Sequence, residues 1–407
     1  MTVSRRTLIG SAAALPVLGA GRARAQGANV LKVGVLTDLS GAYRDVGGPV
    51  STAAAQQAVD EFAGKGFKVE VVQADHQNKT DIGAGIARQW FDRDGVDLIV
   101  DVPNSGVGLA IAGVAKDKNK AYMNSGSSTS DLTGAMCNAN TIHWAYDTYE
   151  LAKSTGSAAV KSGGDSWFFI TADYAFGTAL QRDTTEFVTQ AGGKVLGSVR
   201  YPFPGTTDFS SLLLQAQGSG AKILGLANAG TDTINSIKQA QEFGINKSMK
   251  LAGLLVFISD VHALGLEVAQ GLLLTNSFYW DANERTRKFS ERFKAKAPAV
   301  RATMVQAGVY ASVLHYLKAA ADKGVPFMKA DGAAAVAAMK AMPTDDDCFG
   351  AGTIRADGRK LTEAYLWEVK KPGESKGPWD YYKLVATTPA DQAYRPIDKG
   401  GCNLVHA

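Results

Sequence analysis

The sequence predicts an α/β fold with mainly parallel sheets, and two features of the chain support this prediction. Short apolar segments of strand length alternate with longer segments of helical periodicity over almost the whole chain. Such alternation is typical of repeated strand–helix–strand units, in which helices cover both faces of a parallel sheet. The chain also has 407 residues, more than one hydrophobic core usually supports, so we expect two domains.

The first α/β unit is expected in the N-terminal part of the chain. The segment from Val50 to Phe62 is rich in alanine and carries its apolar residues at helical spacing, which predicts a helix. Strands are predicted at residues 31–36, 69–74, 96–100 and 121–123, and further helices at 81–91 and 106–116.

The alternation starts again near residue 166 and predicts a second α/β unit. Strands are predicted at residues 166–171, 194–199, 222–226 and 251–257, with helices at 177–191, from 209 onward and at 231–243. A strand at 271–279, helices at 283–296 and 304–323, and strands at 365–369 and 381–385 follow. Neither unit is preceded by a linker rich in proline, glycine or serine, so we expect the chain to cross between the domains several times.

The first 25 residues have the composition of an export signal. Arg5 and Arg6 precede a short apolar run, and the segment ends with an A-x-A pattern, Ala23-Arg24-Ala25. We therefore expect a signal peptide at residues 1–25 that is cleaved after Ala25, and a periplasmic mature protein. The paired arginines favour the twin-arginine route, with the general export route as the alternative. No later apolar run approaches the ~20 residues of a membrane-spanning helix.

The charge of the mature chain argues against two classes of partner. The sequence has 43 Lys+Arg and 39 Asp+Glu residues, but four of the arginines and none of the acids lie in the expected signal peptide. The remaining chain is neutral and lacks the long-range field that gathers nucleic acid or anionic lipid. We therefore expect a soluble protein that binds neither.

Three cysteines, Cys137, Cys348 and Cys402, would meet an oxidising compartment after export. One disulfide and one free thiol is the expected count. The pair Cys137 and Cys402 is favoured because it would fasten the C-terminal tail. The other pairings, and three buried reduced thiols, stay open.

Catalytic and cofactor motifs are missing from the sequence. It has no G-x-S-x-G, H-E-x-x-H, P-loop or C-x-x-C pattern, and its five histidines do not stand at metal-ligand spacing. The segment from Gly106 to Gly113 has two residues too many for a dinucleotide-binding fingerprint. We expect neither enzymatic activity nor a cofactor or metal ion.

Hydroxyl-rich loops follow three of the predicted strands. They are residues 40–47, the pair Asn104 and Ser105, and residues 124–133. Sheets of this class place their ligands at the carboxyl ends of the strands. Hydroxyl and backbone N–H groups that converge there could hold a carboxylate without a basic residue. The alternative is a set of polar turns in which Ser and Thr cap helices.

The chain resembles the leucine/isoleucine/valine-binding class of ABC-transporter substrate-binding proteins. The resemblance rests on the order and spacing of residues 33–41, 46–47, 124–133, 171–177, 207–209 and 308–310. It implies the periplasmic binding protein type I fold, with two Rossmann-like lobes joined by three crossings, and delivery of a bound ligand to a membrane permease. Lobe 1 would comprise residues 29–146 and 275–360, and lobe 2 residues 147–274 and 361–407. We expect a monomer.

The resemblance also implies a ligand site between the lobes. The loops at Asn104–Ser105 and 126–129 would hold the ligand carboxylate, and Tyr174 would close over it from the other lobe. The candidate ligand-binding residues are Tyr43, Asn104, Ser105, Gly126, Ser127, Ser128, Thr129, Tyr174, Asn228 and Leu255.

The ligand class follows from the segment 254–257, which matches the position where amino-acid binders carry an acid for the ligand's ammonium group. This segment is Leu-Leu-Val-Phe and has no acid. A buried ammonium group would lack its counter-charge there, which favours a ligand without an α-amino group. Asp232 or Asp260 could serve instead, which keeps branched-chain amino acids as the alternative.

Residues 143–149, 163–169 and 376–382 resemble a branch of the family that includes importers of aromatic acids. Tyr43, Tyr174, Phe176 and Trp280 could form flat apolar walls around a ring, or could be ordinary core and hinge residues. We therefore expect a protein that binds a small organic acid, with an aromatic carboxylate as the favoured ligand. A periplasmic sensor domain and an exported enzyme are the rival classes, because one fold serves all three.

Overall fold

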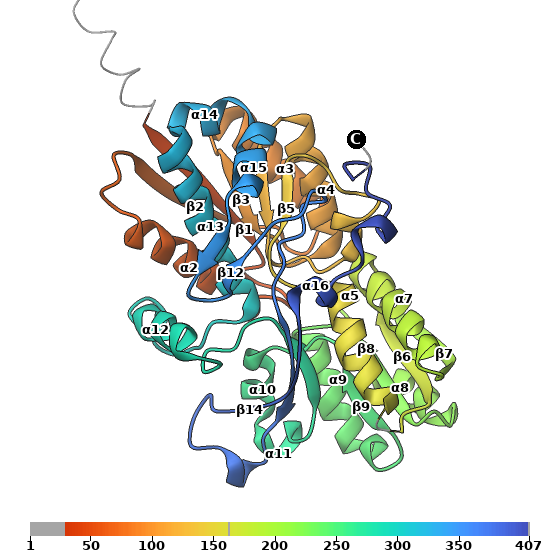
Figure 1. Ribbon diagram of the computed structural model, residues 1–407. Helices are drawn as coiled ribbons and strands as arrows, with labels where there is room; N and C mark the ends of the chain where they lie inside the picture. Colours follow the sequence, from red (N-terminus) through yellow and green to blue (C-terminus); the bar gives the residue numbers. More distant parts are fainter. Residues whose placement is uncertain (1–28, 162, 406–407) are drawn as a thin grey trace, which may run out of the picture.

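The computed structural model describes residues 29–161 and 163–405 and arranges them as two α/β lobes (Figure 1). The predicted signal peptide and its cleavage site lie outside the described residues. Within these residues, none of the helices has the length and apolar character that a membrane crossing requires.

The first lobe contains a five-stranded parallel sheet in the order β2-β1-β3-β4-β5. Its strands are β1 (Val30–Thr37), β2 (Lys68–Asp75), β3 (Leu98–Asp101), β4 (Ala121–Asn124) and β5 (Thr141–His143). Helices α3 (Thr80–Gln89) and α4 (Ser105–Asp117) share an apolar core with one face of the sheet, and α2 (Gly48–Glu61) and α13 (Met304–Lys323) share one with the other. The predicted parallel sheet with helices on both faces is confirmed.

The second lobe contains a four-stranded parallel sheet in the order β7-β6-β8-β9. Its strands are β6 (Ser166–Ala172), β7 (Lys194–Tyr201), β8 (Ile223–Ala227) and β9 (Lys250–Gly253). The helices of this lobe are α7 (Ala175–Gln190), α8 (Ser210–Gly218), α9 (Thr231–Glu242), α10 (Ile258–Leu264) and α11 (Leu266–Ala269).

The chain after α11 visits both lobes. Strands β10 (Leu273–Asn276), β13 (Ala364–Val369) and β14 (Tyr382–Thr388) form an antiparallel sheet whose Trp367 and Val369 pack into the core of the second lobe. Between β10 and β13, helix α13 returns to the first lobe and packs along α2. The elements of this stretch are α12 (Glu284–Phe293), α13, α14 (Val325–Ala330), α15 (Gly332–Ala341), β11 (Thr344–Asp346) and β12 (Gly350–Gly352).

Short helical segments complete the described chain, and several lie where it passes between lobes. They are η1 (Trp90–Asp94), η2 (Ser130–Thr133), α5 (Thr148–Leu151), η3 (Ala152–Gly156), α6 (Ser157–Lys161), η4 (Ile245–Lys247), η5 (Pro372–Glu374), α16 (Ala390–Ala393) and η6 (Ile397–Lys399). The residue limits of the two lobes given above stay a prediction.

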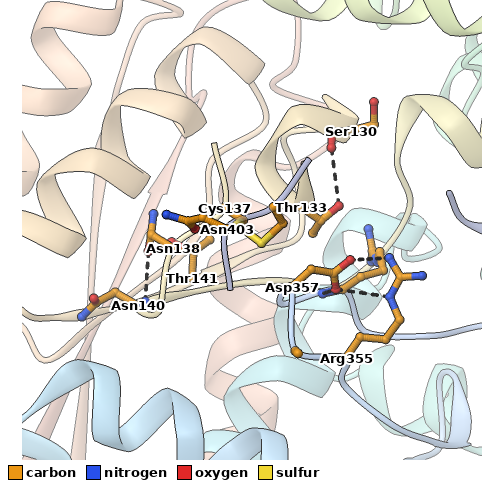
Figure 2. Close-up of a disulfide and its surroundings, with 12 residues drawn as sticks. Ser130, Thr133, Cys137, Asn138, Asn140, Thr141, Arg355, Asp357 and Asn403 are labelled. Atoms are coloured by element: carbon orange, nitrogen blue, oxygen red, sulfur yellow. Dashed lines mark hydrogen bonds and ion pairs between the residues drawn. A yellow bond between two sulfur atoms is a disulfide. The ribbon is translucent and has the colours of Figure 1, made fainter. Parts of the chain in front are cut away.

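A disulfide joins Cys137 to Cys402, with their Cα atoms 5.6 Å apart (Figure 2). This is the pairing favoured from the sequence, and Cys348 is a free, buried thiol. Cys137 follows η2 in the first lobe. The bond therefore fastens the chain end, which the sequence analysis assigned to the second lobe, to the first.

Candidate ligand-binding site

A small pocket lies where loops of the two lobes meet. Its empty space is about 240 Å³, part of it open to solvent, and about 10 Å³ of it can hold the centre of a water molecule. Its walls are Tyr43, Val46, Pro103, Ser105, Gly126, Ser128 and Tyr146 from the first lobe, with Tyr174, Phe176, Ala229, Leu255 and Phe257 from the second. None of these lining residues carries a charged side chain. The cavity is therefore neutral, with hydroxyl groups, glycine backbone and apolar surface as its recognition elements.

Sheet topology explains why these residues meet. Strands β1, β3 and β4 are neighbours in the first sheet and run parallel, so the loops that carry Tyr43, Ser105 and Ser128 leave the same edge. In the second sheet the neighbouring strands β6, β8 and β9 likewise deliver Tyr174 and Leu255. The cavity lies at the carboxyl ends of both sheets, as expected for ligand sites of α/β proteins.

Backbone and hydroxyl donors gather at the first-lobe side of the cavity. Asn104 caps α4 by accepting a 3.0 Å hydrogen bond from the Val107 N–H, so Ser105 is the first helical residue. The Ser105 Oγ accepts hydrogen bonds from the N–H groups of Ser128 (3.3 Å) and Thr129 (3.2 Å). These two N–H groups are engaged by Ser105, so the hydroxyl groups of Ser105 and Ser128 and the positive end of the helix dipole are what could meet a carboxylate without a basic residue.

Two tyrosines, one from each lobe, close the cavity. The hydroxyl groups of Tyr43 and Tyr174 are hydrogen-bonded to each other. The ring of Phe203 stacks on Tyr174 with the centroids 4.5 Å apart and on Tyr43 at 5.3 Å. Burial raises the pKa of both tyrosines, so both hydroxyls stay neutral and serve as hydrogen-bonding groups. This contact between the lobes describes a closed arrangement.

The second-lobe wall is apolar and offers no counter-charge for an ammonium group. Leu255 lines it, as the sequence analysis expected. The two acids held as alternatives do not line the cavity: Asp232 accepts a 2.8 Å hydrogen bond from the Tyr201 hydroxyl, and Asp260 accepts one of 2.9 Å from the Phe257 N–H. Burial raises the pKa of Asp232 to about 6 and that of Asp260 to about 7, which disfavours their charged forms.

Of the ten candidate residues, six line the cavity: Tyr43, Ser105, Gly126, Ser128, Tyr174 and Leu255. The other four make contacts within the protein. Asn104 caps α4 and Thr129 caps η2. The side chains of Ser127 and Asn228 form hydrogen bonds within the protein. The Ser127 hydroxyl donates to the carbonyl oxygens of Val102 (2.6 Å) and Asn104 (2.9 Å). The Asn228 side chain accepts a 2.7 Å hydrogen bond from the Thr233 hydroxyl.

Of the two further aromatic residues proposed as walls, the structure places only one at the cavity. Phe176 lines it. Trp280 does not, because its indole N–H donates to the Trp379 carbonyl at 2.8 Å and its ring lies under the Arg301 guanidinium.

Five lining residues were absent from the candidate set: Val46, Pro103, Tyr146, Ala229 and Phe257. Pro103 and Ala229 adjoin the candidates Asn104 and Asn228, and Val46, Tyr146 and Phe257 lie in the segments that follow β1, β5 and β9, which was the signal available in the sequence. Tyr146 also supports the site, since its hydroxyl donates to the Gly126 carbonyl at 3.0 Å.

The described residues contain no group of three or more His, Cys, Asp or Glu side chains arranged to hold a metal ion.

Comparison with known proteins identifies the scaffold. Residues 30–377 match the family model described as periplasmic binding protein. The Leu/Ile/Val-binding protein homolog 6 of Brucella melitensis is 26% identical over 372 residues, which cover 84% of this chain and 88% of that protein.

Solved structures show the same similarity. A periplasmic binding protein from Burkholderia mallei is 50% identical, with a TM-score of 0.89 over 93% of this chain and 100% of its own. A branched-chain amino acid ABC transporter periplasmic ligand-binding protein from Burkholderia xenovorans is 40% identical, with a TM-score of 0.80 over 92% and 99%. An ABC-transporter solute-binding protein from R. palustris, in complex with benzoate, shares the fold at 20% identity, with a TM-score of 0.80 over 92% and 99%.

These similarities confirm the predicted α/β fold, which is the type I fold of periplasmic binding proteins. Proteins of this kind are exported, bind small molecules and do not convert them, so the chain is a binding protein and not an enzyme. The match covers most of the chain, and the chain belongs to the periplasmic binding protein family.

Proposed function

We propose that this protein binds a small aromatic carboxylate between its lobes and delivers it to the permease of an ABC importer. One observation carries the proposal: the cavity combines the serine residues Ser105 and Ser128 on one side with aromatic and apolar walls on the other, and its lining has no charged side chain. A carboxylate would meet the hydroxyl groups, and an aromatic ring would pack against the apolar walls once the two tyrosines separate to admit it. The benzoate bound to the R. palustris protein of the same fold supports this ligand class.

An amino-acid ligand would meet a less suitable wall. Its ammonium group would lie against Leu255 and Phe257, and an unpaired buried charge costs several kcal/mol. The names of the Brucella and B. xenovorans relatives nonetheless favour branched-chain amino acids as the second candidate. That function would require Asp232 or Asp260 to leave its present hydrogen bond and face the cavity.

A thermal-shift panel tests the ligand class. Benzoate and hydroxybenzoates should raise the melting temperature as their concentration exceeds Kd, because a ligand that binds only the native state stabilises it. Leucine, isoleucine and valine should produce little change. Stabilisation by the branched-chain amino acids without any by the aromatic acids would contradict the proposal and select Asp232 and Asp260 as counter-charges.

Removing the two hydroxyls on the carboxylate side should weaken binding, and Ser105→Ala should also lower stability because its Oγ accepts hydrogen bonds from the N–H groups of Ser128 and Thr129. We expect Ser105→Ala and Ser128→Ala each to reduce benzoate affinity by about 1–3 kcal/mol, because each hydroxyl that meets a buried carboxylate is lost. Isothermal titration calorimetry measures the affinity, and thermal unfolding measures the stability.

Ser127→Ala is the matched contrast, because this hydroxyl points away from the cavity to two backbone carbonyls. It should lower the melting temperature more than it lowers affinity. Unchanged affinity in both Ser105→Ala and Ser128→Ala would move the carboxylate elsewhere in the cavity.

A further inference from the structure

Asp101, at the end of β3, lies in a strained turn beneath the cavity. Its φ is +80° and that of Val102 is +62°, a left-handed conformation that residues other than glycine rarely adopt. The Asp101 carbonyl accepts hydrogen bonds from the N–H groups of Ser125 (3.3 Å) and Gly126 (3.0 Å). The turn thus connects β3 to the loop that lines the cavity, and such strain is concentrated at functional sites.

The Asp101 side chain is fully buried, and neither carboxyl oxygen has a hydrogen bond of good geometry among the described residues. A Cβ atom placed on Gly126 would lie 2.9 Å from the Asp101 Oδ1, and one on Gly47 would lie 2.9 Å from its Oδ2. Gly126 also lines the cavity. Gly126 therefore lies close to the Asp101 carboxyl group and also borders the cavity where a ligand carboxylate would lie.

The surroundings of this carboxyl group favour its neutral form. Burial is the main cause and raises the pKa of Asp101 to about 7, and the Asp38 charge raises it further, while hydroxyl groups lower it by less. The polar and titratable groups that face it are Thr37 and Asp38 at the end of β1, Ser51 on α2, Tyr122 on β4 and Tyr146 after β5.

We propose that Asp101 is a positioning residue that takes up a proton when a carboxylate ligand binds. This inference rests on the proposed function. A ligand carboxylate on the far side of Gly126 repels a charged Asp101 but tolerates a protonated one. The ligand therefore raises the pKa of Asp101. Affinity is highest when Asp101 is already protonated and falls as the pH rises through about 7.

Calorimetry with benzoate as the probe tests this assignment. For the wild-type protein we expect Kd to rise several-fold between about pH 6 and pH 8.5, within the limit of tenfold per pH unit for one proton. Titrations in two buffers of different ionisation enthalpy should show net proton uptake on binding at neutral pH. Asp101→Asn, which imitates the protonated acid in shape and charge, should bind without proton uptake and with an affinity independent of pH.

Two other buried acids near the cavity provide matched controls. Asp232→Asn and Asp260→Asn should keep the pH dependence and the proton uptake of the wild type, although their own pKa values are also raised. Loss of proton uptake in either control, but not in Asp101→Asn, would overturn the assignment.

The wild-type titrations decide the case even where Asp101→Asn does not fold. Benzoate binding with no proton uptake and a constant Kd would refute the role of Asp101 while leaving the proposed function intact. Failure of benzoate and every hydroxybenzoate to bind at any pH would instead refute the proposed function, and this inference with it.

Discussion

Gly126→Ala is expected to reduce carboxylate affinity at least a hundredfold, about 3 kcal/mol. A Cβ atom on residue 126 would lie 2.6 Å from the Pro103 nitrogen and 2.7 Å from its Cα, both backbone atoms that cannot rotate away. The loop after β4 must then move away from the loop after β3. That movement separates the N–H groups of Ser128 and Thr129 from Ser105 and dismantles the carboxylate side of the cavity. Overpacking should also lower stability by about 1–3 kcal/mol.

Gly106→Ala is the matched control in the neighbouring loop. Its added Cβ would meet its nearest atoms at 3.4 Å, an ordinary contact, and residue 106 lies in the first turn of α4. Alanine favours a helix over glycine by roughly 0.5–1 kcal/mol, so this variant should bind as the wild type does and be no less stable. Calorimetry and denaturant unfolding compare the pair. Wild-type affinity in Gly126→Ala would mean that the ligand does not contact this loop.

The sequence pattern predicted the parallel sheets well because local periodicity and burial agree there. Helix α13 has the predicted bounds, since Thr303 caps it and a long apolar face fills the core. The strand predicted at 251–257 is wrong in its second half: β9 ends at Gly253, and the buried apolar residues that follow pass the cavity as a loop. Apolar composition reports burial, and a loop between two lobes can be as buried as a strand.

The pairing of β10, β13 and β14 into one antiparallel sheet could not be predicted from local sequence patterns. Leu274 pairs with Trp367, so the register depends on how the chain folds between them. The strands themselves were predicted at 271–279, 365–369 and 381–385, although β10 is shorter than its prediction. Pairing across such a separation is set by packing into the second lobe, which sequence periodicity does not encode.

In the candidate site, too, the contacts of single side chains could not be predicted from the sequence pattern. Ser127 and Ser128 are adjacent and chemically identical, yet the Ser127 hydroxyl donates to two backbone carbonyls while Ser128 lines the cavity. The position of each serine in the turn determines which contacts it makes, and the amino-acid composition of the loop does not reveal that position. Tyr146 resembles a core residue in sequence, and only its position after β5 brings it beneath Gly126.

Cys402→Ser is expected to lower the free energy of unfolding by about 2–5 kcal/mol. The bond between Cys137 and Cys402 closes a chain segment with a sequence separation of 265, and cross-links over long loops restrict the unfolded chain most. It also holds the tail in the position where Arg395 pairs with the buried Asp183 of the second lobe at 3.0 Å. Denaturant unfolding under oxidising conditions measures the difference.

Reduction should have the same effect as the substitution. Dithiothreitol should lower the free energy of unfolding of the wild type to that of Cys402→Ser and should not change that of Cys402→Ser. Cys348→Ala is the control: dithiothreitol should destabilise it as much as the wild type, because Cys348 is a free thiol. Equal unfolding midpoints for wild type and Cys402→Ser would contradict the prediction.

Reduction should also affect ligand binding. Cys137 follows the hydroxyl-rich loop by only a few residues, and the Arg395 guanidinium in the tail donates to the Ser130 hydroxyl of that loop at 3.3 Å. A tail released by reduction would loosen this contact. Stability and benzoate affinity should therefore fall together on reduction, and the loss of affinity should be the smaller effect because Ser105 and Ser128 stay in place.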